Sequence, residues 1–97
     1  MQIENFIGGK FIPPLNSKYL ENYNPATGKQ TSKIPDSTAH DIQLAVDAAQ
    51  QALPLWSKLP MAERIAWLRN IAEALESHKS KIAELESMDT GKPLSLA

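Results

Sequence analysis

The feature that most constrains this fold is the glycine pair Gly8-Gly9, which separates two short runs rich in apolar residues. Two adjacent glycines can both adopt positive φ, which is the backbone requirement of a type I′ hairpin turn. Pro13-Pro14 then ends the second strand, because proline cannot donate to a sheet ladder. A phosphate-binding loop needs more glycines and a following helix. The pattern therefore predicts a hairpin, with strands over Asn5–Ile7 and Lys10–Ile12.

A second turn is predicted at residues 24–28, which read Asn-Pro-Ala-Thr-Gly. Proline fixes φ at the first central position of a turn, and glycine closes it. The flanking segments 19–23 and 29–34 have the character of strands, so both hairpins are expected within residues 3–35. An isolated two-stranded hairpin is only marginally stable in water. The absence of a long central strand suggests that a further sheet, from a longer chain or from a partner, covers these hairpins.

Helical periodicity replaces the strand pattern after Pro35 and is expected over residues 38–90. The first helix begins at a capping box formed by Thr38 and Asp41, in which each side chain covers an exposed backbone N–H group. Pro54 is expected to disturb or end this helix, leaving Leu55 and Trp56 in the connection that follows. The predicted apolar face consists of Ile42, Ala45, Val46, Ala49 and Leu53.

Two further helices are predicted before the C-terminal segment. Pro60 suits the first turn of the second helix, and Ser77 or Ser80 is a candidate cap for the third. Gly91, followed by Pro93, is typical of a helix stop. The apolar stripes are Ile65, Leu68, Ile71, Ala72 and Leu75 on the second helix, and Ile82, Leu85 and Met88 on the third. The sequence thus predicts an α/β fold of two hairpins followed by about three amphipathic helices.

The composition excludes several classes of function. The chain has no cysteine, so it contains no disulfide, thiolate metal site or cysteine nucleophile. Its net charge is −1 and its basic residues are scattered, which argues against nucleic-acid binding. The start lacks the apolar core of a signal peptide, and no apolar run is long enough to span a membrane. We therefore expect a cytoplasmic protein. A chain of this mass would bury about two-thirds of its unfolded surface, enough for a modest core, if it folded alone.

No catalytic constellation is visible in the sequence. His40 and His78 are far apart and are expected to be solvated surface residues. Gly91-Lys92 lacks the flanking glycine and hydroxyl residue of a phosphate-binding loop. Trp56 and Trp67 are expected to anchor a core or an interface, because neither lies in a basic stretch that would suggest base stacking.

Five segments, in this order and at these spacings, resemble the N-terminal part of the NAD(P)-dependent aldehyde dehydrogenases. They are NFIGGKF (5–11), NYNPATGK (22–29), the helix from Asp41 to Leu53 leading into Trp56-Ser57, AERIAWLRNIAEALE (62–76) and ELESMDTGKP (84–93). The resemblance covers the chain from Ile3 to Leu96. The opening residues look nearest to the branch that acts on muconic-type semialdehydes, such as 2-aminomuconate or 2-hydroxymuconate semialdehyde.

The resemblance implies a large α/β protein with a Rossmann-like cofactor domain, a catalytic domain and a small oligomerisation sheet. Such enzymes oxidise an aldehyde to the carboxylic acid with NAD or NADP. A cysteine thiolate attacks the aldehyde, hydride passes to the nicotinamide, and a glutamate-activated water hydrolyses the thioester. A small-molecule aldehyde or semialdehyde substrate and a homodimer or homotetramer are also implied.

The chain departs from this family pattern because it lacks the cysteine and ends before the cofactor loop and the catalytic glutamate would appear. We therefore expect residues 1–97 to be the incomplete N-terminal segment of an aldehyde dehydrogenase, inactive alone, with NAD or NADP bound by the remainder. The alternative is a non-catalytic interaction module derived from a dehydrogenase N-terminus. Its hairpin edges would pair with a partner sheet by β-augmentation.

The resemblance also implies a monovalent cation site. In many family members the cation is held by backbone carbonyls just before the Asn-Pro turn and by an aspartate before the Gly-Lys-Pro. Carried over by motif, these positions are Asn22, Tyr23 and Asp89. Carbonyl and carboxylate oxygens suit a hard cation. The remaining family ligand would lie beyond Ala97.

Overall fold

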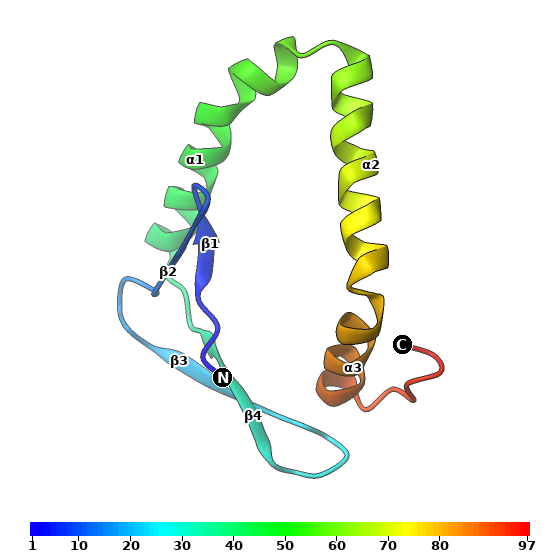
Figure 1. Cartoon of the computed structure of the whole chain (residues 1–97). Coiled ribbons are helices and arrows are strands. Elements are labelled where there is room, and N and C mark those ends of the chain that lie inside the picture. Colours follow the sequence, from blue (N-terminus) through cyan, green and yellow to red (C-terminus); the bar gives the residue numbers. More distant parts are fainter.

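The computed structural model describes all 97 residues and consists of two β-hairpins followed by three helices (Figure 1). The strands are β1 (Asn5–Ile7), β2 (Lys10–Ile12), β3 (Tyr19–Tyr23) and β4 (Gln30–Pro35), and the helices are α1 (Ala39–Lys58), α2 (Met61–Ser77) and α3 (Lys79–Thr90). The predicted α/β arrangement is therefore confirmed, with the hairpins inside residues 3–35 and the helices inside residues 38–90.

Each hairpin forms its own two-stranded antiparallel sheet. Gly8 and Gly9 have φ values of 60° and 80°, which confirms the turn expected from the glycine pair. In the second hairpin, Asn24 accepts hydrogen bonds at its backbone carbonyl from Gly28 N–H, and at its side-chain oxygen from Ala26 N–H. The start of the chain adds to the edge of β4, since Ile3 N–H donates to the carbonyl of Lys33 over 2.8 Å.

The capping box at the start of α1 is confirmed. Asp41 accepts from the backbone N–H of Thr38 over 2.7 Å, and Thr38 Oγ1 accepts from the backbone N–H of Asp41 over 3.4 Å. Pro54 does not end the helix, because α1 continues through it to Lys58, so Leu55 and Trp56 lie in α1 rather than in a connection. Proline removes one helix hydrogen bond, but the last turn is still closed by Leu59 N–H donating to the carbonyl of Trp56.

The α2–α3 junction also differs from the prediction. His78 is the boundary residue of both helices, and α3 has no side-chain cap. The hydroxyl of Ser77 donates instead to the carbonyl of Ala74 within α2, and Ser80 lies inside α3. Pro60 stands at the N-cap of α2 rather than in its first turn. Gly91 caps α3 with φ 76°, which confirms the predicted helix stop.

The modest core that the length would allow to a chain folding alone is not present. No hydrophobic residue is buried, and the three buried residues are Pro14, Ser32 and Asp41. The accessible surface is 7698 Å², against about 15,500 Å² for an unfolded chain of this mass, so about half of the surface is buried rather than two-thirds. The two tryptophans remain 42% and 56% exposed and anchor no core within this chain.

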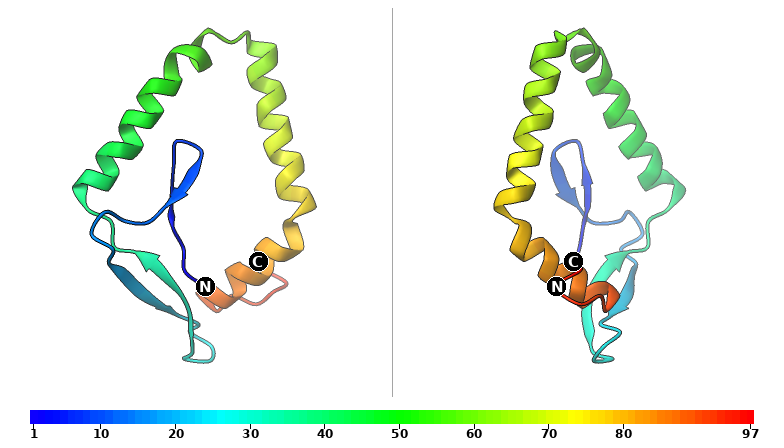
Figure 2. Two further views of the ribbon diagram at one scale, coloured as in Figure 1. Left: turned by 60° about the vertical axis from the view of Figure 1, so that its left-hand side comes forward. Right: turned by 90° about the vertical axis from the view of Figure 1, so that its right-hand side faces the viewer.

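The cause is the open shape of the molecule. Helices α1 and α2 form the two legs of an arch, with the hairpins at the foot of α1 and α3 at the foot of α2 (Figures 1 and 2). The Cα radius of gyration is 17.0 Å, whereas about 12.5 Å is expected for a compact domain of this length. Apart from the hairpins themselves, the most extensive packing between elements is that of α1 on β1.

Candidate functional site

The two ends of the arch meet where the β3–β4 hairpin approaches α3. Asn22 Nδ2 donates to Asp89 Oδ1 over 2.6 Å, although 67 residues separate the two in sequence. The turn of the hairpin reaches the C-terminal cap of α3, because a Cβ at Gly91 would lie 3.1 Å from Cγ of Pro25. The segment Asn-Tyr-Asn-Pro-Ala-Thr-Gly-Lys is therefore both a hairpin turn and a contact surface for the end of α3.

An open cavity of about 420 Å³ lies at this junction. Two of the three residues predicted for the cation site, Asn22 and Asp89, line it, and Tyr23 does not. The side chain of Tyr23 is half exposed, and its hydroxyl donates to Glu21. This hydrogen bond to the carboxylate raises the pKa of Tyr23. The remaining lining residues are Met1, Ile3, Thr31, Ile34, Leu85 and Met88.

The donor chemistry at the junction matches a hard cation in type but not in number. Asp89 provides a carboxylate and Asn22 a backbone carbonyl, which already accepts from the hydroxyl of Thr31 over 3.3 Å. Hard cations such as calcium take about six or more oxygen ligands. The chain contains no cluster of three or more His, Asp or Glu side chains that could hold a metal ion. Further oxygen ligands would therefore have to come from outside these residues.

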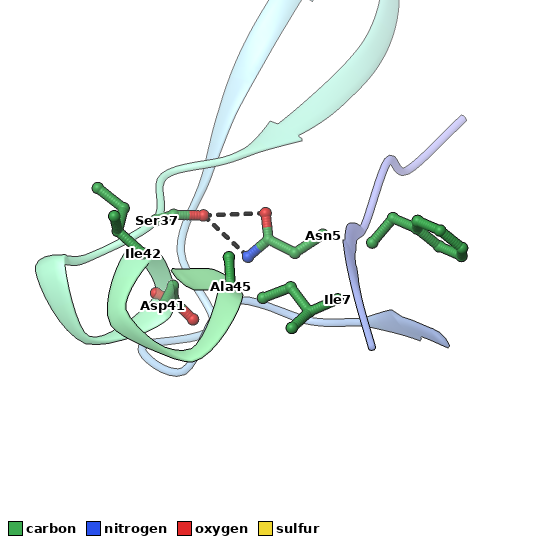
Figure 3. Close-up of a pocket in the computed structure, with 7 residues that line it drawn as sticks. Asn5, Ile7, Ser37, Asp41, Ile42 and Ala45 are labelled. Carbon is green, nitrogen blue, oxygen red and sulfur yellow. Dashed lines mark hydrogen bonds between the residues drawn. The ribbon is translucent and has the colours of Figure 1, made fainter. Parts of the chain in front are cut away.

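A second open cavity, of about 170 Å³, lies where α1 packs on β1 (Figure 3). Asn5 and Ser37 bridge its rim with two hydrogen bonds of 2.9 and 3.1 Å, and Ile7 faces Ala45 across it (Figure 3). Its floor includes Asp41, which is only 2% exposed. The cavity is therefore lined by both polar and apolar side chains, with the Asn5–Ser37 pair at one side.

Asp41 is a structural group rather than an acid or base. One carboxylate oxygen accepts from Leu15 N–H over 3.0 Å, and the other accepts from the backbone and hydroxyl of Thr38. The hydrogen bonds from Thr38 and Leu15 favour the ionised form and lower the pKa of Asp41. The capping motif predicted the bond to Thr38, but no sequence signal indicated the bond to Leu15, because it depends on how residues 13–17 fold back.

The remaining ionisable side chains form no catalytic cluster. His40 and His78 are exposed, as predicted, and lie on different elements. The salt bridges Lys79–Glu76, Lys81–Glu84 and Lys92–Glu86 are all solvent-accessible. Such pairs contribute little to stability. Ser77 Oγ and His78 Nδ1 lie 3.0 Å apart, but both residues are exposed at the end of α2, and the same ring nitrogen also lies 2.8 Å from the carbonyl oxygen of Ala74.

Comparison with known proteins gives a consistent answer. Residues 11–97 match the sequence profile described as "Aldehyde dehydrogenase family". The chain belongs to the aldehyde dehydrogenase family. This confirms the resemblance recognised in the sequence. Because the match includes residues from both hairpins and all three helices, it does not depend on a single motif.

Individual relatives support the same family. The chain is 44% identical over 97 residues to the 2-aminomuconic semialdehyde dehydrogenase of Mus musculus and 43% identical over 91 residues to an EPTC-inducible aldehyde dehydrogenase of Rhodococcus erythropolis. The alignments cover 100% and 94% of this chain. As the resemblance predicted, 2-aminomuconic semialdehyde dehydrogenases are among its most similar relatives.

The arch itself occurs in solved aldehyde dehydrogenases. It superimposes on the NAD⁺ complex of the Bacillus cereus enzyme with a TM-score of 0.95 and 34% identity, over 100% of this chain and 20% of that one. The relatives are likewise matched over only 18–20% of their length. The chain thus spans about a fifth of the proteins it resembles.

The chain contains no cysteine that could act as a nucleophile. None of its helices combines the length and apolar character that crossing a bilayer requires. The 97 residues supply helices with exposed apolar faces and a polar junction at Asn22 and Asp89.

Proposed function

We propose that residues 1–97 form the N-terminal segment of an NAD(P)-dependent aldehyde dehydrogenase. The complete enzyme would oxidise an aldehyde or semialdehyde to the carboxylic acid as a cytoplasmic homodimer or homotetramer. The observation that carries the proposal is the match of the whole arch, at TM-score 0.95, to a fifth of an enzyme solved with NAD⁺. An arch without a core is the form expected of a segment that is completed by further chain.

Within such an enzyme these residues would support the catalytic domains rather than react. In the proposed enzyme the cysteine nucleophile would lie in the remaining four-fifths, since this chain has no cysteine. The general base and the NAD(P) site would lie there as well. NAD(P), when bound there, would accept the hydride from the substrate. The contribution of this chain is to present α1, α2 and the hairpins as a fixed framework, with Asp41 and the Asn22–Asp89 bond holding its two ends.

The substrate proposed is a small semialdehyde. Three relatives at 41–44% identity are 2-aminomuconic semialdehyde dehydrogenases. Relatives of similar identity carry other names, such as the Long-chain-aldehyde dehydrogenase of an Acinetobacter species at 41%. The substrate therefore has to be tested directly, with 2-aminomuconate semialdehyde against a long-chain aldehyde.

We also propose that Asn22, Tyr23 and Asp89 contribute to a monovalent cation site in the complete enzyme. Asn22 and Asp89 support this proposal because they meet at one cavity and offer carbonyl and carboxylate oxygens. Tyr23 would contribute its backbone carbonyl, which follows Asn22 directly in β3. Removal of the Asp89 carboxylate would leave a site of neutral oxygens and weaken cation binding.

The test is a chimera in which residues 1–97 replace the matched fifth of the Mus musculus 2-aminomuconic semialdehyde dehydrogenase. The expected result is a folded protein that reduces NAD⁺ or NADP⁺ in the presence of the semialdehyde, measured at 340 nm. The 97-residue chain alone is the matched control and should show no turnover. A folded chimera without activity, or turnover by the chain alone, would contradict the proposal.

A further inference from the structure

The side chain of Asn22 has a place at the junction that is separate from that of its backbone carbonyl. Its amide nitrogen donates to Asp89 Oδ1 over 2.6 Å and to Ser32 Oγ over 3.3 Å. We infer that Asn22 acts through this amide as a positioning residue, which holds the Asp89 carboxylate in place for the proposed monovalent cation. This inference rests on the proposed cation site and adds a second role for Asn22 within it.

Asn22 is itself held by two residues of β4. Ser32, which pairs with Asn22 across the hairpin, is only 4% exposed, and its hydroxyl accepts from the amide. The hydroxyl of Thr31 donates to the backbone carbonyl of Asn22 over 3.3 Å. A carbonyl oxygen has two lone pairs, so one remains for a cation. The sheet therefore fixes both the amide and the carbonyl of Asn22 without help from a ligand.

The chemistry of Asp89 decides which way the Asn22 amide points. An ionised carboxylate only accepts hydrogen bonds, whereas an asparagine side chain has a donor end and an acceptor end. The nitrogen must therefore face Asp89, because the reverse orientation would place two acceptors against each other. Ser32 is compatible with this direction, since a hydroxyl can accept as well as donate.

The bond leaves the charge of Asp89 and one of its oxygens available. Asp89 takes part in none of the three salt bridges, and no group of the chain donates to its Oδ2. The residue is exposed near the end of α3, so without the bond its side chain could change rotamer. Partners that orient a metal-binding side chain typically contribute about 10–100-fold to metal affinity. A neutral amide can therefore fix the carboxylate without cancelling the charge that attracts the cation.

The experiment measures the potassium affinity of the chimera from its thermal stability. Melting curves are recorded over a series of potassium chloride concentrations, with tetramethylammonium chloride keeping the ionic strength constant, and the dependence of stability on potassium gives the affinity. Asn22→Ala keeps the backbone carbonyl and removes the amide, so the affinity should fall by about 10-fold or more. An unchanged affinity overturns the inference. A higher affinity also overturns it, because the amide would then compete with the cation.

Asn5→Ala is the matched control for a purely structural role. The amide of Asn5 also joins a strand to a later segment, since it hydrogen-bonds to Ser37. Asn5→Ala should lower the melting temperature in both salts and leave the potassium affinity unchanged, because the changed group is remote from the junction. Equal losses of affinity in Asn5→Ala and Asn22→Ala would mean that Asn22 acts only through the stability of the fold, which overturns the inference.

A double-mutant cycle separates the positioning role from the proposed site. Asp89→Ala should remove most of the response to potassium, and adding Asn22→Ala should then change it no further, because the amide acts through Asp89. Ser32→Ala removes only the anchor of the amide and should lower the affinity by less than Asn22→Ala. An unchanged response in Asp89→Ala contradicts the cation site and the inference together. A response that depends on Asp89 but not on Asn22 overturns the inference alone.

Discussion

The first turn of α1, at the foot of the arch, and the helix α2, which forms one of its legs, differ in where their stabilising interactions are made. At the foot, Asp41 is buried and its carboxylate joins Thr38 and Leu15, so polar groups are satisfied within the chain. On α2 no residue is buried, and the apolar stripe has no partner. The difference indicates which parts of the structure the 97 residues can determine themselves. The foot has its own interactions, whereas the leg depends on what covers it.

The largest effect should come from placing a charge on the uncovered leg. Ile71→Glu should destabilise the chimera by about 3 kcal/mol or more, because the carboxylate would be buried without a partner. The same change should leave the isolated chain almost unaffected, since Ile71 is 54% exposed there. Urea unfolding measures the change in stability of the chimera, and far-ultraviolet circular dichroism measures the change in helix content of the isolated chain. Similar destabilisation of both proteins would show that α2 does not depend on the rest of the chimera for its stability.

Alanine substitutions at two glycines, Gly91 and Gly8, test the contact between the β3–β4 hairpin turn and α3. Gly91→Ala should destabilise the chimera by roughly 1–2 kcal/mol through its positive φ alone. The new Cβ would in addition lie 3.1 Å from Pro25. Gly8→Ala is the matched control, because Gly8 has φ +60° but no atom near its missing Cβ. Thermal melting should therefore show a larger loss for Gly91→Ala. Equal losses would mean that Pro25 does not constrain α3.

The cap at the foot of α1 can be removed without changing the apolar stripe of α2. Thr38→Ala should cost about 1 kcal/mol, the usual effect of losing an N-cap side chain. Thr27→Ala is a control, because Thr27 lies in the exposed hairpin loop. Chemical denaturation of the chimera measures both changes. A loss from Thr38→Ala no larger than that from Thr27→Ala would show that the capping box contributes nothing measurable.

We predict that ionisation of Asp41 makes the stability of the first turn of α1 depend on pH. Its pKa is lowered in the folded chain, so the stabilisation it gives is complete above its unfolded pKa and is lost as pH falls through the folded value. The amide protection factors in the first turn of α1, which are corrected for the pH dependence of intrinsic exchange, should therefore fall in acid below the ordinary aspartate pKa. The Asp41→Asn variant should have lower protection factors at neutral pH and should not lose further protection in acid. An equal loss of protection in acid in this variant would mean that other carboxylates cause it.

The smallest expected effect concerns the cation. Potassium should raise the melting temperature of the chimera by a few degrees more than an equal concentration of a bulky organic cation, and Asp89→Ala should reduce this difference. Asp47→Ala, on the exposed side of α1, is the control. An unchanged response to potassium in Asp89→Ala would contradict the proposed site.

The sequence predicted the elements that depend on local chemistry. The glycine pair, the Thr38–Asp41 capping box and the Gly91 stop each require a particular backbone conformation, and each was found. Pro54 was misjudged because loss of one hydrogen bond did not end a helix with further turns on both sides. The third helix begins at Lys79 after His78, which makes no side-chain capping bond, so a search for a capping serine could not locate its start.

Long-range features could not be predicted from spacing. The Asn22–Asp89 bond joins residues 67 positions apart, and only the family resemblance suggested that they belong together. The bond from Leu15 to Asp41 uses a backbone N–H, which every non-proline residue has and which therefore leaves no sequence signal. The sequence could not indicate that the chain lacks a core. The apolar stripe of a helix has the same spacing whether residues of the same chain or of another part of the protein cover it.

The most direct test of the difference between foot and leg is amide hydrogen exchange of the 97-residue chain, alone and within the chimera. The account predicts that the first turn of α1 is protected in both, whereas the amides of α2 exchange rapidly in the isolated chain and become strongly protected in the chimera. Protection of α2 that is equal in the two proteins would show that the leg is stable by itself. That result would contradict the claim that the rest of an aldehyde dehydrogenase completes this fold.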